Sequence, residues 1–138
     1  MTTPLTNKQV ESAAIAYVIE REAHDGRVAR DTRGQGAAGD LVSGDRTIEV
    51  KAYGTTARGS DLWLEVRQVE EARVNPDFWL YIVENIGQGD STAFRLLRIG
   101  GEPLHSLLGR AREKHYYEVP FPVSVYDNLM ANDSRLHS

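Results

Sequence analysis

Three ionisable residues, Asp40, Glu49 and Lys51, are spaced so that a sheet could bring them together. Residues 47–53 alternate between polar and apolar types, which is typical of a half-buried strand. Alternate residues of a strand share a face. We therefore predict that Glu49 and Lys51 point the same way, while Ile48 faces a core on the other side.

A hairpin would place the third side chain beside these two. Residues 41–43 form a short predicted strand, and residues 43–46 have the composition of a tight turn. If the two strands pair antiparallel, Asp40 lies level with Glu49. Two carboxylates suit a hard cation such as Mg²⁺ or Mn²⁺, because Mg²⁺ usually takes only one or two protein carboxylates. Such an ion lowers the pKa of a bound water, and Lys51 would position that water or neutralise phosphate charge.

The same residues also have an ordinary structural explanation. A lone Glu-x-Lys on a strand is usually a solvated sheet face with one ion pair, worth under about 1 kcal/mol. Taken alone, Glu49 and Lys51 favour that explanation. The position of Asp40, an acidic residue on a preceding helix and the apolar run at residues 78–83 together shift the balance toward a chemical site.

Asp40 followed by Glu49-Val50-Lys51 resembles the motif of the PD-(D/E)XK nuclease superfamily, although Gly39 stands where that motif has proline. A narrower resemblance, to the NO VEIN carboxy-terminal domain, covers about residues 8–100. It rests on a helix followed by four segments in order: Ala-Gly-Asp-Leu at 38–41, Ile-Glu-Val-Lys-Ala at 48–52, Leu-Trp-Leu-Glu-Val-Arg-Gln at 62–68 and Asp-Phe-Trp-Leu-Tyr-Ile-Val-Glu-Asn at 77–85.

The resemblance implies a restriction-endonuclease-like fold and a role in phosphodiester hydrolysis for Asp40, Glu49 and Lys51. It also implies that the metal is bound by Asp40, Glu49, the Val50 carbonyl and an acid of the first helix, which Glu11 matches best. The resembled domain usually has Glu or Gln where this chain has Gln68, so Gln68 is a further candidate near the site. For Glu11 and Gln68 a solvated helix surface is an equally weighted alternative.

The pattern of elements predicts an α/β sandwich with a central mixed sheet flanked by helices, in the order α-β-β-β-α-β-β. Asn7 is expected to cap a first helix at residues 8–23, on which Glu20 and Glu22 are solvated. The other expected elements are strands at 41–43, 47–53 and 62–64, a helix at 65–74 with Val66 inward, strands at 78–83 and 92–99, and a short edge strand at 27–31.

Length and composition predict one domain over residues 1–138, with a core at about 8–100 and an extension at about 101–138. In the extension we expect a helix at 103–112, a strand at 116–121 and a helical turn or two at 124–130. The chain has no cysteine, no apolar run of membrane-spanning length and no signal-peptide pattern at its start, so we expect a cytoplasmic protein without a membrane partner. The four histidines are dispersed and show no ligand spacing.

Two functions remain open from the sequence. The first is a Mg²⁺- or Mn²⁺-dependent nuclease of restriction, repair or defence, acting on nucleic acid, with DNA favoured over RNA. The second is a catalytically inactive nuclease-fold module that binds nucleic acid or protein, a reading favoured by the formal net charge of -4. Residues 116–130 are rich in apolar and aromatic side chains. They predict a homodimer, unless they close the core of their own chain.

Overall fold

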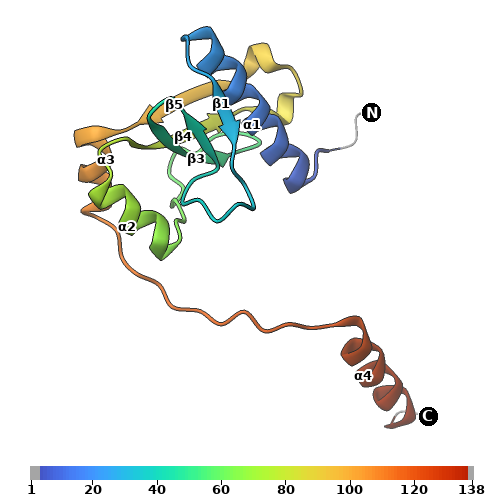
Figure 1. Cartoon of the computed structure of the whole chain (residues 1–138). Coiled ribbons are helices and arrows are strands. Elements are labelled where there is room, and N and C mark those ends of the chain that lie inside the picture. The colour runs from blue at the N-terminus through green and yellow to red at the C-terminus, as the bar shows by residue number, and fades with distance from the viewer. Residues whose placement is uncertain (1–3, 137–138) are drawn as a thin grey trace.

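The computed structural model describes residues 4–136 and has an α/β fold with a five-stranded mixed sheet and four α-helices in that range (Figure 1). The elements follow in the order α1 (Asn7–His24), β1 (Ala29–Asp31), β2 (Leu41–Ser43), β3 (Arg46–Ala52), α2 (Val66–Val74), β4 (Phe78–Glu84), β5 (Arg95–Ile99), α3 (Gly101–Leu108) and α4 (Val123–Leu136). Two short 3₁₀ helices, η1 (Ile86–Gln88) and η2 (Ser91–Ala93), lie between β4 and β5.

The strands lie in the sheet in chain order, from β1 at one edge to β5 at the other. Neighbouring strands are antiparallel except β3 and β4, which are parallel because the chain crosses over through α2 between them. The continuous apolar run at residues 78–83 therefore forms a buried inner strand, as its sequence predicted.

Each face of the sheet has its own apolar core. On one face α1 packs on β3 and β4, and the buried cluster there includes Val18, Ile48, Val50 and Tyr81. On the other face α2 and α3 cover a second cluster: Ala72, Phe78, Leu80, Leu104 and Leu108. The prediction that Ile48 faces a core is confirmed. Because the opposite face is also covered, Glu49 lies in a buried position between sheet and helices.

Several predicted boundaries are wrong for identifiable reasons. Thr6, not Asn7, caps α1, because its hydroxyl accepts a hydrogen bond from the Gln9 N–H at 3.1 Å. Residues 62–64 form no strand, since Leu62 and Leu64 pack against the second core as an irregular segment. The expected element order is kept only because β1, the predicted short edge strand, takes the vacant place.

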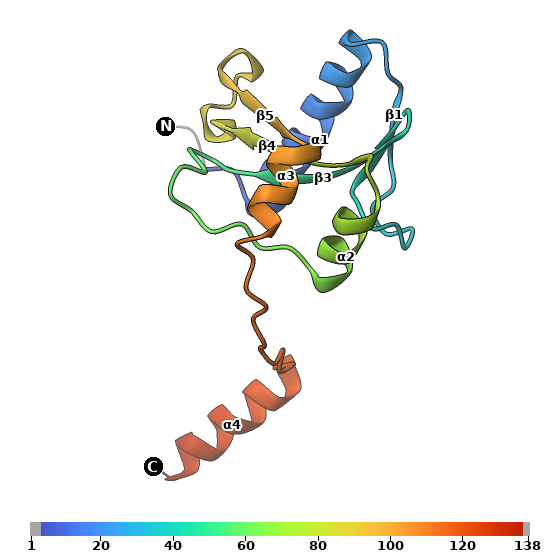
Figure 2. The ribbon, with the colours of Figure 1, turned by 90° about the vertical axis from the view of Figure 1, so that its left-hand side faces the viewer.

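The carboxy-terminal part differs most from the prediction. Helix α3 is shorter than expected, residues 109–122 have no regular structure in place of the strand at 116–121, and α4 is a full helix rather than a turn or two. Figures 1 and 2 show α4 held away from the sheet and its covering helices. Within residues 4–136, no helix is long and apolar enough to span a membrane.

Candidate functional site

The hairpin of β2 and β3 places Asp40 close to Glu49, because the charge of Asp40 acts on the Glu49 carboxyl. The antiparallel register ends with Leu41 and Ile48, and Asp40 and Glu49 are the residues that follow this last pair outward. The Asp40 N–H donates to the Ile48 carbonyl at 2.8 Å, and the Asp40 Oδ2 accepts from the Val50 N–H at 2.9 Å. The carboxylate thus continues the hydrogen-bond ladder where β2 has ended. This fixes the side chain as well as the backbone.

Gly39 allows the backbone to come this close. A Cβ at Gly39 would lie 2.7 Å from the Ile48 carbonyl oxygen, closer than real Cβ contacts come. On the other side, the Thr32 N–H donates to the Asp40 carbonyl at 2.8 Å and the Thr32 hydroxyl donates to the Gly39 carbonyl at 3.1 Å. The residue that precedes Asp40 is therefore determined by steric contact at the site itself.

Glu49 is a buried carboxylate with one oxygen unsatisfied. Its Oε2 lies 3.1 Å from the Lys51 ammonium, whereas no hydrogen-bond donor among the described residues reaches its buried Oε1. Burial, and then the charge of Asp40, raise the pKa of Glu49 to about 7, against a smaller opposing effect of Lys51. A carboxylate in this setting gains from any cation that approaches Oε1.

The Val50 carbonyl faces the same edge as Asp40. In a strand, the N–H and C=O of one residue point to the same side, and the Val50 N–H points to Asp40. The pairing of β2 with β3 ends at Leu41 and Ile48, so no residue of β2 pairs with this carbonyl. Two carboxylates and one carbonyl oxygen therefore border the same space, which is a donor set of the kind that Mg²⁺ and Mn²⁺ take.

Glu11 is not brought into this group. It lies on α1 and forms an ion pair at 3.1 Å with Arg33, which also binds Asp31 at 2.8 Å. Across residues 4–136, no three His, Cys, Asp or Glu side chains are grouped so that they could hold a metal ion. The site as it stands offers two carboxylates, which suffices for a partly hydrated magnesium ion.

The amino-terminal turn of α2 lies against the loop that leads to Asp40. Arg67 donates to the carbonyls of Gly36 and Ala37, at 3.1 and 2.9 Å. Gln68 is buried rather than solvated, and its Oε1 accepts from the Glu65 N–H at 3.0 Å at the start of the helix. The surface alternative for Gln68 is thus wrong, and the side chain has a capping role on the covered face that carries Glu49.

Arg67 and Glu84 were not among the predicted site residues. Glu84 ends β4 on the same face as Glu49, and its Oε2 accepts from the Thr56 hydroxyl and the Ala57 N–H, both at 2.7 Å. The hydrogen bond from the Thr56 hydroxyl has the largest effect on the pKa of Glu84, and together with the bond from Ala57 it lowers that pKa. The polar loop after β3 is thereby tied to the sheet. The sequence signal that could have identified Glu84 is an acidic residue at the end of an apolar run, followed by Asn85.

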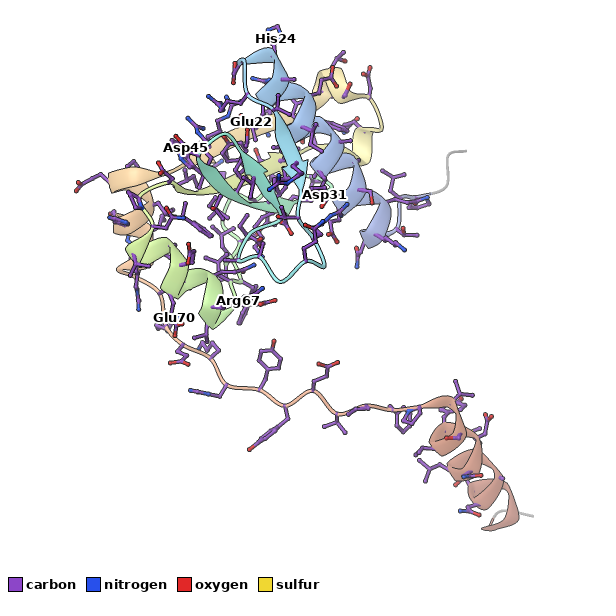
Figure 3. All side chains as sticks on the ribbon, viewed as in Figure 1. Glu22, His24, Asp31, Asp45, Arg67 and Glu70 are labelled. Atoms are coloured by element: carbon purple, nitrogen blue, oxygen red, sulfur yellow. The ribbon has the colours of Figure 1, made fainter. Side chains whose placement is uncertain are left out.

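Glu22 corrects a sequence prediction outright. It was expected to be solvated, yet it is fully buried between α1 and the sheet (Figure 3). Arg27 binds it through two hydrogen bonds of 2.8 and 2.9 Å, and Ser43 and Arg98 donate at 3.0 and 3.1 Å. Burial alone would raise its pKa, but the hydrogen bonds from Arg27 and Ser43 outweigh it and lower the pKa to about 2.

Comparison with known proteins gives one match. Residues 10–97 fit the model of the family described as protein NO VEIN, C-terminal. No curated protein and no solved structure matches the chain. The matched segment runs from α1 through β5 and includes every residue of the candidate site. The chain belongs to the NO VEIN C-terminal family.

Proposed function

We propose that this NO VEIN C-terminal family protein is a metal-dependent nuclease with a restriction-endonuclease-like fold. The observation that carries the proposal is the buried Glu49, which lies near Asp40, has no hydrogen-bond partner on Oε1 and meets Lys51 with its other oxygen at 3.1 Å. Burying a carboxylate beside a second, half-buried carboxylate is unfavourable unless a cation compensates for them. A structural ion pair of Glu49 and Lys51 would not require Asp40 at the same place.

Asp40, Glu49 and the Val50 carbonyl are the residues that would hold Mg²⁺ or Mn²⁺. When bound there, the ion would supply charge stabilisation at a phosphodiester and a lower pKa for a bound water. The residues of the chain do the rest. The hydrogen bond from Val50 holds Asp40 in place, and the covering helices keep water away from Glu49, which strengthens its interactions.

Lys51 is the group proposed to act on the nucleophile. Its ammonium is anchored by Glu49, and its side chain remains about a quarter exposed, so it can still meet a substrate phosphate or an attacking water. The basic residue Arg58 lies on the loop that Glu84 ties down, directly after the anchored Ala57. This loop offers a cation for the phosphate backbone in a chain whose net charge is otherwise negative.

Cleavage assays with purified protein test the proposal. Single- and double-stranded DNA, and RNA of the same sequence, are incubated with Mg²⁺, with Mn²⁺ or with EDTA. We expect cleavage that needs the metal and is lost in Asp40→Asn and in Lys51→Ala, with DNA cut in preference to RNA. Asp45→Asn, an exposed residue of the hairpin turn, is the matched control and should cut normally.

A binding module without catalysis is the competing function. It predicts a nucleic-acid complex but no cleavage product with either metal. Calorimetry separates the two at the level of the site: the nuclease proposal requires Mn²⁺ binding that disappears in Glu49→Ala. If neither Mn²⁺ binding nor cleavage is found in folded protein, the nuclease proposal fails, whatever the affinity for DNA.

A further inference from the structure

The carboxy-terminal segment forms an arm that leaves the body of the protein. After α3 the chain runs through residues 109–122 without regular structure and then forms α4 (Figures 1 and 2). Every residue from 109 to 133 is exposed. We call residues 109–122 together with α4 the arm.

The arm is too apolar to be an ordinary solvated tail. Its extended part exposes Tyr117, Val119 and Phe121 by 96, 78 and 63%, at every second position. In α4, the apolar side chains fall on one side of the helix: Val123, Val125, Tyr126, Leu129 and Met130. Exposed apolar surface of this extent marks a surface that another molecule covers.

The arm is stiffened in a direction that leads away from its own body. Pro120 and Pro122 fix the backbone just before α4, and each also restricts the preceding residue to extended conformations. Figure 3 shows the side chains of this stretch projecting into solvent on all sides. A return of α4 onto its own sheet would have to reverse the chain within residues 109–122, and the two prolines stiffen the part nearest α4.

The body of the protein carries an apolar surface that matches the arm. Apart from Val74 at the carboxy-terminal end of α2, four large apolar side chains on the elements of the side covered by α2 and α3 remain 41 to 62% exposed: Trp63, Val66, Leu97 and Leu107. Leu97 is paired with Ile82 and so points to the same face of the sheet as Lys51. Val66 had been expected to point inward but lies at the start of α2 on the outside. We call these four residues the acceptor surface.

Charge is complementary as well. Residues 109–122 contain three Lys or Arg and two Asp or Glu, whereas residues 61–74, which carry Trp63 and α2, contain four Asp or Glu and two Arg. The extended part of the arm is therefore slightly basic, and the segment around Trp63 and Val66 is slightly acidic, while α4 has two Asp and one Arg. Complementary charges favour the pairing of the extended part with this segment over the pairing of two extended parts.

We propose that the arm of one chain packs on the acceptor surface of a second copy, and that the exchange is reciprocal in a two-fold dimer. The four aromatic residues of the arm would each bury up to about 150–250 Å², so one arm contributes up to roughly 600–1,000 Å² and two arms up to roughly 1,200–2,000 Å² before the acceptor side is counted. These residues are Tyr116, Tyr117, Phe121 and Tyr126. Stable interfaces bury about 1,200–2,000 Å² in total. The acceptor surface lies on the face of the candidate site, so each arm would run beside the site of its partner.

The experiment uses full-length chains and light scattering at micromolar concentration. Wild-type protein should have the mass of a dimer. Leu129→Glu, which breaks the apolar side of α4, and Val66→Glu, which breaks the acceptor surface, should each give a monomer. Ser124→Glu adds the same charge on the opposite side of α4 and should remain dimeric. Urea unfolding of each variant verifies that the body is folded.

Mixing the two broken variants tests the exchange itself. A Leu129→Glu chain keeps its acceptor surface and a Val66→Glu chain keeps its arm, so the mixture can form one of the two arm contacts. We expect a mixed dimer at concentrations where each variant alone is monomeric. A monomeric wild type, a dimer unaffected by Val66→Glu, or a mixture with no mixed dimer would each overturn the proposal.

Discussion

The backbone N–H of Val50 donates a hydrogen bond of 2.9 Å to the carboxylate of Asp40. This single contact joins the two halves of the acidic motif, which lie ten residues apart in the chain. It makes Asp40 a structural acceptor, while the charge of the same carboxylate acts on Glu49. Charge and hydrogen bonding at this position can therefore be separated by substitution.

Asp40→Asn keeps the acceptor for Val50 and removes the negative charge. We expect its free energy of unfolding to stay within about 1 kcal/mol of wild type, while Asp40→Ala loses about 1–2 kcal/mol because the Val50 N–H is left unpaired. Both variants should reduce metal-dependent cleavage by at least about 100-fold, since even indirect supports of metal ligands cost 10- to 100-fold. Urea titrations and cleavage rates measure the two effects.

Asp45→Asn serves as the control, because it removes one carboxylate from the same hairpin without touching the site. An Asp40→Asn protein that binds Mn²⁺ with wild-type affinity would remove Asp40 from the metal site.

The raised pKa of Glu49 predicts a distinctive pH dependence in metal-free protein. An acid whose pKa is about 7 in the folded state and about 4.5 in the unfolded state binds more protons when folded in that interval. Its contribution to stability is therefore greatest at low pH and is lost as pH rises from about 4.5 through about 7. Glu49→Gln should be more stable than wild type at pH 8 by a few kcal/mol, and the difference should shrink by pH 5.

Metal should reverse this behaviour. Adding Mn²⁺ at pH 8 is expected to raise the urea midpoint of the wild type and to leave Glu49→Gln nearly unchanged, because ligands that bind only the folded state stabilise it. If the stability of wild type and of Glu49→Gln depended on pH in the same way, Glu49 would ionise at no cost in the folded protein. A bound cation would then not be needed to compensate for its charge.

Gly39→Ala should disturb the site through sterics alone. The new Cβ would press against the Ile48 carbonyl at 2.7 Å and push Asp40 away from Glu49. We expect a loss of about 1–3 kcal/mol, as for other overpacked positions, together with weaker Mn²⁺ binding in calorimetry. Gly54→Ala is the matched control, since a Cβ there meets nothing within 4 Å. Unchanged metal affinity in Gly39→Ala would mean that the hairpin absorbs the strain elsewhere.

The elements whose patterns are local were predictable from the sequence. The alternation of polar and apolar residues predicted β3, and the predicted hairpin brought Asp40 close to Glu49. The uninterrupted apolar run gave β4. In each case the spacing of apolar residues along a short stretch of sequence matches the element that forms, so the stretch alone is enough to predict the element.

The predictions that were wrong concern residues whose environment depends on partners far away in the sequence. Leu62 and Leu64 have the alternation of a strand, but they pack on the second core without strand partners. Glu22 follows Val18 by four residues and so lies on the buried side of α1, but a charged residue type predicted a solvated position. Its partner Arg98, 76 residues later, helps to explain why it is buried. Glu11 has the expected helix position, yet Arg33 binds its carboxylate. No local pattern reports such pairings.

The buried Glu22 gives the last prediction, with a pH dependence opposite to that of Glu49. Its pKa of about 2 in the folded state lies below the unfolded value of about 4.5, so its contribution to stability is present above pH 4.5 and is lost as pH falls toward 2. Glu22→Gln leaves Arg27 and Arg98 facing a neutral group. Breaking a buried ion pair costs about 3–5 kcal/mol, and we expect a loss toward the lower end because Asp25 still pairs with both arginines.

Glu20→Gln is the matched control, because Glu20 is exposed on the same helix and should change stability by no more than about 0.5 kcal/mol. Urea unfolding at pH 7, 4 and 3 measures all three proteins. The gap between wild type and Glu22→Gln should be largest at pH 7 and narrow steadily below pH 4.5, whereas Glu20→Gln should follow the wild type throughout. A gap that stays constant from pH 7 to pH 3 would show that Glu22 acts through its shape and hydrogen bonds rather than through its charge.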